Sequence, residues 1–191
     1  MRLTTLFFIT LSTAAMTLFA VHADEKDDHA EIAPNGAACR IRATKGNKVN
    51  GFLTFKQHDG WVHVSGRVRN LTEGEHGFHI HQFGDVRAAD GTSAGGHFNP
   101  DGHDHGGPDS DKHHAGDLGN ITADADGLAE INIKAKELKV ISILGRSIVI
   151  HAGADDLKSQ PSGAAGPRVG VGVIGIAGPP AKKAAAAKKK N

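Results

Sequence analysis

The sequence of 191 residues contains one cysteine, Cys39, one tryptophan and no tyrosine. One cysteine excludes a disulfide within the chain. Because the chain has no plausible thiolate ligand, iron–sulfur clusters and thiolate zinc sites are excluded as well. We expect Cys39 to be a buried or half-buried thiol. A bridge from Cys39 to another chain is the alternative.

Long apolar runs are also missing, because none reaches the ~20 residues that a membrane-spanning helix needs. The most apolar stretch, 1–23, starts with the charged Arg2 and ends in small residues around Ala23. This order is typical of a secretory signal peptide. A retained membrane anchor is the alternative, but several Thr and Ser residues interrupt the stretch. We therefore predict an exported protein, periplasmic or extracellular, whose mature chain starts near Asp24.

Neither sign of charge dominates, since the formal net charge is +1. Without Arg2 and the five lysines of residues 179–191, the 22 basic residues fall to 16 against 21 acidic ones, a balance of −5. We predict a flexible acidic segment at 24–37, one domain at 38–178 and a disordered, Lys- and Ala-rich tail at 179–191. A weak contact of the tail with polyanions or a membrane surface is possible, but nothing favours specific nucleic-acid recognition.

Short apolar segments separated by turn residues occupy the predicted domain. Val62 and Val64 alternate with polar residues after an Asp-Gly turn at 59–60, and Ile131 and Ile133 alternate in the same way. About eight such segments, without a convincing helix, predict an all-β Greek-key sandwich or flattened barrel. Two Gly-rich connections, 85–116 and 152–167, are longer than ordinary turns and are predicted to be functional loops.

Histidines are the main candidate functional residues of the sequence. His79 and His81 are two residues apart in a predicted strand, so their side chains share one face and can bind one metal ion. Further candidate ligands follow along the chain: His97, His103, His105, His113, His114, Asp117 and His151.

The types of these residues narrow the choice of metal. A set with a carboxylate, such as His105, His114 and Asp117, suits zinc. A purely imidazole set, such as His79, His81 and His151, suits copper or catalytic zinc. The spacing leaves open whether there is one site or two.

Several separate motifs resemble those of the copper/zinc superoxide dismutases, in the same order. They are GFHIHQFGD at 77–85, TSAGGHFNP at 92–100, HGGP at 105–108, HAGDLGN at 114–120, HAGADD at 151–156 and GVIGIA at 172–177. The resemblance extends over residues 38–177. It implies dismutation of superoxide to oxygen and hydrogen peroxide, with copper passing an electron between two superoxide ions. A non-catalytic module that buffers copper or zinc is the alternative.

The resemblance also implies a role for individual residues. The copper ligands would be His79, His81, His97 and His151. The zinc ligands would be His97, His105, His114 and Asp117, with His97 as the bridging imidazolate and the proton donor on the copper side. Asp155 would hydrogen-bond a histidine of each site, and Arg168 would attract and position superoxide. His103 and His113 have no counterpart among the ligands, so we expect both to be solvated.

One departure from the family concerns the disulfide that usually ties the metal-binding loop to the last strand. Gly91 and Val171 occupy the matching positions here. We therefore expect the loop to depend more on zinc for its order. The apolar last strand could pair two subunits in a homodimer, or it could be part of the core.

Overall fold

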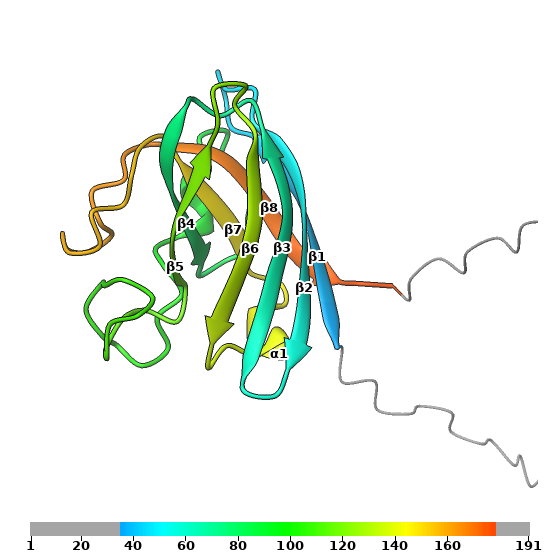
Figure 1. Ribbon diagram of the computed structural model, residues 1–191, viewed down its shortest axis with the longest axis vertical. Coiled ribbons are helices and arrows are strands. Elements are labelled where there is room, and N and C mark those ends of the chain that lie inside the picture. Colours follow the sequence, from blue (N-terminus) through cyan, green and yellow to red (C-terminus); the bar gives the residue numbers. More distant parts are fainter. Residues whose placement is uncertain (1–34, 179–191) are drawn as a thin grey trace, which may run out of the picture. The chain divides into compact units, whose positions relative to one another are not determined.

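The computed structural model describes residues 35–178, which form eight β-strands, one 3-10 turn and one short helix (Figure 1). The elements are β1 Gly36–Ala43, β2 Asn50–His58, β3 Trp61–Arg69, β4 Gly74–His81, η1 Thr92–Ala94, β5 Asp117–Ala123, β6 Ala129–Lys136, α1 Val140–Ile143, β7 Ser147–His151 and β8 Arg168–Ile176. The predicted signal peptide, most of the predicted acidic segment and the predicted tail lie outside the described residues.

The strands follow from the alternation of apolar and polar residues. Leu53 and Phe55 of β2 and Val62 and Val64 of β3 are all buried, while the residues between them are more exposed. The two strands are joined at the predicted Asp-Gly turn, where Gly60 has a φ of 73°, a backbone conformation that glycine adopts readily. Burial of one face of each strand builds the core.

All strand pairs are antiparallel, in the order β5-β4-β7-β8-β1-β2-β3-β6. The first and last strands of this order, β5 and β6, also pack against each other, so the sheet closes almost completely into a barrel. Because β3 pairs with β6 and β4 pairs with β7, the connections between these pairs must cross an end of the barrel, as in a Greek key. The predicted fold class is confirmed.

Two details differ from the expectation. Helix α1 was not predicted, because four residues are too few to show a helical period; Val140 and Ile143 are buried, and Gln57 Oε1 accepts the N–H of Val140 at 2.8 Å. The apolar run 171–177 predicts the last strand, but the strand begins three residues earlier, at Arg168. Among the described residues no helix has the length and apolar character to cross a membrane.

Cys39 is buried in the barrel core, and burial raises the pKa of its thiol to about 12. The thiol is therefore protonated at neutral pH and a poor nucleophile. The expectation of a buried thiol is confirmed.

The two long loops lie on the same side of the barrel, beside β4 and β5 (Figure 1). They explain why β4 is buried on both faces: Phe78 and Ile80 belong to the hydrophobic core, while His79 and His81 alternate with them and are equally inaccessible. The loops thus create a second, polar interior outside the apolar one.

Candidate metal centre

His79 and His81 of β4 form the base of the centre, because the pleat directs both side chains to one face. His151 ends the neighbouring β7, at an irregularity in the pairing with β8. His97 comes from the loop, which returns to pair with β4: Phe98 N–H donates to Ile80 O at 2.8 Å, and His97 forms an isolated bridge with His81. Backbone pairing therefore brings all four histidines together.

These residues form what we call the four-histidine cluster: His79, His81, His97 and His151. One ring nitrogen of each lies within 4.8 Å of the others. These nitrogens are buried and have no hydrogen-bond partner among the described residues: His79 Nδ1, His81 Nε2, His97 Nε2 and His151 Nε2. Buried polar atoms are rarely left without a partner, so four of them directed at one point fit a metal ion.

The other ring nitrogen is held by a hydrogen bond in all four; in His97 it is Nδ1, which bonds Asp117 Oδ1 at 2.7 Å. His81 Nδ1 donates to Gly95 O and His151 Nδ1 to Gly166 O, each at 2.8 Å, and His79 Nε2 donates to Asp155 Oδ2 at 2.7 Å. Such bonds set the tautomer and turn the free nitrogen toward the metal.

Burial lowers the pKa values of His79, His81 and His151 and keeps these three imidazoles neutral. Burial is the main cause that lowers the pKa of His81 to about 2 and that of His151 to about 4. The nearby Arg168 guanidinium and the neighbouring histidines lower both pKa values further. At neutral pH the free nitrogens therefore offer lone pairs, the form in which histidine binds a metal.

A second group, the mixed cluster, is arranged around a carboxylate oxygen and consists of His97, His105, His114 and Asp117. Asp117 Oδ1 lies 2.7 Å from His97 Nδ1, 3.1 Å from His105 Nδ1 and 3.3 Å from His114 Nδ1. Neighbouring ligand atoms of a tetrahedral zinc ion with ~2.0 Å bonds are about 3.3 Å apart, so three imidazoles and a carboxylate in this arrangement fit zinc.

Asp117 is itself firmly placed. Its Oδ2 accepts the backbone N–H groups of His114 at 2.9 Å and Gly106 at 3.2 Å. Burial raises the pKa of the carboxyl, but the hydrogen bonds from His97, Gly106 and His114 outweigh it and lower the pKa to about 2. Asp117 is therefore an anion at neutral pH, as a metal ligand must be.

His97 belongs to both clusters, because its two ring nitrogens face opposite sides. Nε2 is directed to the four-histidine cluster and Nδ1 to Asp117. The centroid of its ring lies 4.0 Å from that of His79 on one side and 5.3 Å from that of His105 on the other. One imidazole between two candidate metal positions is the central feature of the site.

Asp155 joins the two clusters a second time. Its Oδ2 accepts from His79 Nε2 at 2.7 Å and its Oδ1 from His105 Nε2 at 3.0 Å. A Cβ atom at Gly163 would lie only 1.8 Å from Asp155 Oδ1, so this position needs glycine. Burial raises the pKa of Asp155, but its hydrogen bonds from His79, Leu157 and His105 outweigh burial and keep that pKa well below its usual range.

A pocket of about 470 Å³ opens onto the four-histidine cluster, with His81, His97, His151 and Arg168 in its wall. The guanidinium of Arg168 is held by the carbonyl oxygens of Gly91 and Gly95. Burial lowers the pKa of Arg168, yet an arginine remains charged at neutral pH. The pocket therefore presents a fixed positive charge beside the histidines and suits a small anion.

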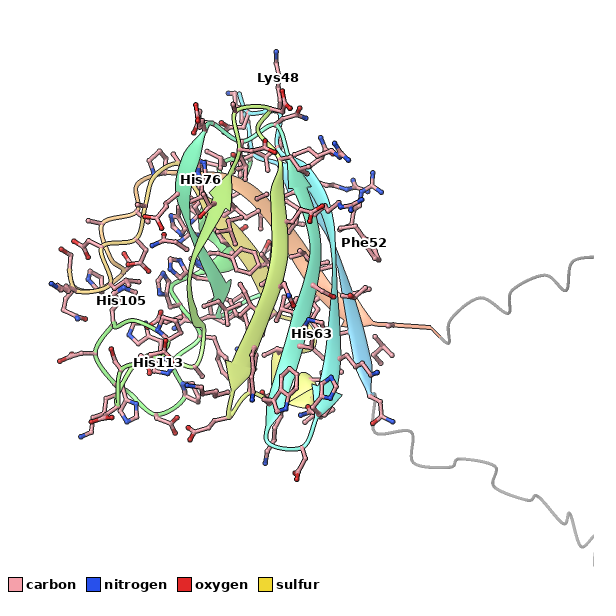
Figure 2. All side chains as sticks on the ribbon, viewed as in Figure 1. Lys48, Phe52, His63, His76, His105 and His113 are labelled. Carbon is pink, nitrogen blue, oxygen red and sulfur yellow. The ribbon has the colours of Figure 1, made fainter. Side chains whose placement is uncertain are left out.

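The remaining histidines of this region lie outside both clusters. His113 Nδ1 donates to His114 O at 2.7 Å, and His103 Nδ1 lies 3.3 Å from His113 O. Both are partly exposed. Figure 2 shows His76, His105 and His113 on the side of the long loops, while His63 lies over β3.

The sequence predicts that His76 is structural and not a ligand, but it did not reveal the contacts that hold the candidate ligands in place. His76 is buried, and its Nδ1 lies 2.7 Å from His151 O. Asn120 and Gln160 bond to the backbones of Asp155 and His105, respectively. Each of these contacts joins residues 35 to 75 positions apart, so no local signal in the sequence could have revealed them.

Comparison with known proteins gives consistent matches. The family model described as "Copper/zinc superoxide dismutase (SODC)" matches residues 49–174. The chain is 46% identical over 155 residues to Cu-Zn superoxide dismutase 3 of Arabidopsis thaliana, across 75% of this chain and 94% of that protein. It is 44% identical over 158 residues to the extracellular Cu-Zn superoxide dismutase of Onchocerca volvulus, across 75% and 78% of the two chains.

A solved structure agrees with these relatives. The crystal structure of the clock protein EA4 superposes with a TM-score of 0.69 at 38% identity, across 75% of this chain and 96% of that one. The family match, the barrel and the two adjoining clusters lead to one conclusion. The chain belongs to the copper/zinc superoxide dismutase family, and its cofactors are copper and zinc.

Proposed function

We propose that this protein dismutates superoxide to oxygen and hydrogen peroxide. Copper would be held by His79, His81, His97 and His151, and zinc by His97, His105, His114 and Asp117. The observation that carries the proposal is the position of His97, whose two ring nitrogens face the two clusters. Relatives that are 40–46% identical are named for this activity.

Bound copper supplies the one-electron carrier that the reaction needs, and zinc supplies a fixed charge without redox chemistry. Residues of the chain attract the substrate and supply a proton. Arg168 attracts superoxide into the pocket and orients it beside the four-histidine cluster. Nε2 of His97 carries the proton that the departing peroxide takes up, while Nδ1 remains on the zinc side.

Two features hold the site in its active arrangement. Asp155 prevents His79 and His105 from turning, because it bonds one ring nitrogen of each. Gly95 O bonds both His81 and Arg168, so it couples a candidate copper ligand to the anion-binding side chain. Neutral imidazoles and a charged guanidinium can therefore coexist within one small pocket.

A module that stores copper and zinc without turnover is the second candidate from the sequence. The two clusters alone would be sufficient for such storage. The guanidinium of Arg168 in the pocket wall favours the enzyme, because a storage site gains nothing from a fixed cation beside its metal.

We also propose that the chain is exported. Relatives named as extracellular enzymes, from Onchocerca volvulus and Brugia pahangi, support export. In this proposal residues 1–23 are the signal peptide and residues 38–178 are the catalytic domain. A weak contact of the 179–191 tail with polyanions or a membrane surface belongs to the same proposal. Purified mature chain should remain soluble and monodisperse when the tail is deleted, with only its retention on anionic resin reduced.

A homodimer is the proposed assembly. Phe83, Val86, Val173 and Ile176 are 40–70% exposed, and Gly84 packs against Val173, so part of this apolar surface is continuous. Exposed apolar patches of this kind are typical of subunit contacts. Sedimentation of the wild-type chain and of Val173→Lys tests it: a dimer that the substitution converts to a monomer supports the contact, and a wild-type monomer excludes it.

The decisive experiment measures dismutation and metal content on one preparation of the mature chain. Activity with about one copper and one zinc per chain supports the enzyme. Full occupancy without activity would show that the chain only stores metal. Removing zinc alone then tests its structural role, since copper should remain bound.

A further inference from the structure

The side chain of Gln160 holds the backbone of His105 by two hydrogen bonds. Gln160 Nε2 donates to His105 O at 2.8 Å, and Gln160 Oε1 accepts the N–H of His105 at 2.8 Å. The two residues belong to different loops and lie 55 positions apart. Because one carboxamide satisfies both polar groups of one residue, that backbone cannot shift or rotate without breaking both bonds.

The imidazole of His105 is held from the same loop. Its Nε2 donates to Asp155 Oδ1 at 3.0 Å. Asp155 is held in turn by Asn120 of β5, which donates to Asp155 O and accepts the N–H of Asp155, both at 2.8 Å. The loop 152–167 therefore fixes both ends of His105 and is itself anchored to the barrel.

These contacts leave one ring nitrogen of His105, Nδ1, available to bind a metal ion. Nδ1 is buried, has no hydrogen-bond partner among the described residues and lies 3.1 Å from Asp117 Oδ1. His114, the neighbouring member of the mixed cluster, differs, because within residues 35–178 its ring makes no hydrogen bond. The backbone of His114 is bonded to Asp117, so of the two residues only His105 has both its backbone and its ring held by hydrogen bonds within the described residues.

We propose that Gln160 is a positioning residue for zinc, which places His105 before the metal binds. This inference rests on the zinc assignment of the proposed function. Without Gln160, the His105 backbone would become ordered only when zinc binds. The conformational entropy lost in that ordering would make the free energy of zinc binding less favourable. Copper binding should depend little on Gln160, because the clamped residue is not part of the four-histidine cluster.

The chain contains a matched control. Asn99 holds His103 in the same way, with Nδ2 donating to His103 O at 2.7 Å and Oδ1 accepting the N–H of His103 at 3.0 Å. His103 belongs to neither cluster. Asn99→Ala therefore removes the same kind of clamp from the same loop without touching a candidate ligand.

The test measures zinc and copper affinity separately for the full mature chain, by competition with chromophoric chelators. Gln160→Ala should weaken zinc by about tenfold, as loss of a partner that orients a ligand commonly does, and change copper affinity less than twofold. Asn99→Ala should leave both within twofold. Equal losses of zinc and copper in Gln160→Ala, an equal loss in Asn99→Ala, or no loss at all would overturn the inference.

A second measurement does not need a folded alanine variant. Hydrogen exchange on the metal-free wild type should show a protected His105 N–H, and Gln160→Asn, one methylene shorter, should exchange faster at that amide. An unprotected His105 amide in the metal-free wild type would contradict the inference. If the wild type itself binds no zinc, the zinc assignment fails as well; if it binds zinc as tightly as Gln160→Ala does, only this inference fails.

Discussion

The two halves of the metal centre are held in different ways. In the four-histidine cluster, His79 and His81 lie on β4 and His151 ends β7, so three of the four members come from paired strands. In the mixed cluster only Asp117 lies in a strand, at the first position of β5, and His105 and His114 belong to the loop before it. The four-histidine cluster is therefore built mainly on the sheet, whereas the mixed cluster is built mainly on the loop beside it.

This difference decides what sets each geometry. The strand histidines take their direction from the pleat, and backbone carbonyls of Gly95 and Gly166 complete it. The loop histidine His105 takes its direction from the side chains of Asp155 and Gln160. We infer that the pleat of the sheet sets the direction of most copper-side histidines, whereas the zinc side depends mainly on contacts between the two loops.

The largest expected effect comes from His151→Ala, which removes a strand-borne member. Activity should fall by at least about a thousandfold, while zinc remains bound because the mixed cluster is intact. The assay is dismutation together with zinc and copper content. His63→Ala, on β3 and in neither cluster, is the control and should behave as wild type. Retained activity in His151→Ala would contradict the copper assignment.

Asp117→Ala tests the loop-borne half. Its carboxylate contacts three histidines of the mixed cluster, so zinc affinity should fall by at least about a hundredfold and copper affinity much less. Competition titrations with each metal measure the two effects. Asp111→Ala, an exposed carboxylate of the same loop, should change neither. Unchanged zinc affinity in Asp117→Ala would remove this residue from the zinc site.

Acid should destabilise the metal-free protein through the strand-borne half. The pKa of His151 is lowered to about 4 and that of His81 to about 2, below the ~6.5 of an unfolded histidine, so the unfolded chain binds more protons as the pH falls. Stability from these groups is complete above about pH 7.5 and declines below pH 6.5. Near pH 5 each should cost roughly 2 kcal/mol.

Urea unfolding of the metal-free chain between pH 8 and pH 5 measures this loss. His151→Gln should reduce the slope of stability against pH, because one buried neutral imidazole is removed. A stability that does not change over this range would show that the cluster is not buried in the metal-free chain.

The smallest effect concerns Arg168, a strand residue that holds the loop through Gly91 and Gly95. Arg168→Glu should slow dismutation by about tenfold or more by repelling the anion, and Arg168→Lys only a few-fold. Dismutation rates at low and high salt measure the electrostatic attraction of superoxide. Metal content of the same samples shows whether the substitution has instead disturbed the order of the loop. A wild-type rate in Arg168→Glu would remove Arg168 from the mechanism.

The parts of the site that could be predicted without the family resemblance are those that depend on local periodicity. His79 and His81 share a face because a strand repeats every two residues, and the same rule placed Val62 and Val64 in the core. Helix α1 could not be predicted, because four residues are too few to show a helical period. The expectation that the loop relies on zinc in the absence of a disulfide stays a prediction.

By itself the sequence determined the strands, the apolar face of each strand and the histidines that are candidate metal ligands. These features follow from the types and order of neighbouring residues. The residues alone left open whether there was one metal site or two, and only the resemblance to a family divided them. The tertiary structure decided which nitrogen of His97 faces which cluster and that Gln160 holds His105. Such contacts join residues far apart in the chain, and only the closing of the barrel brings them within hydrogen-bond distance.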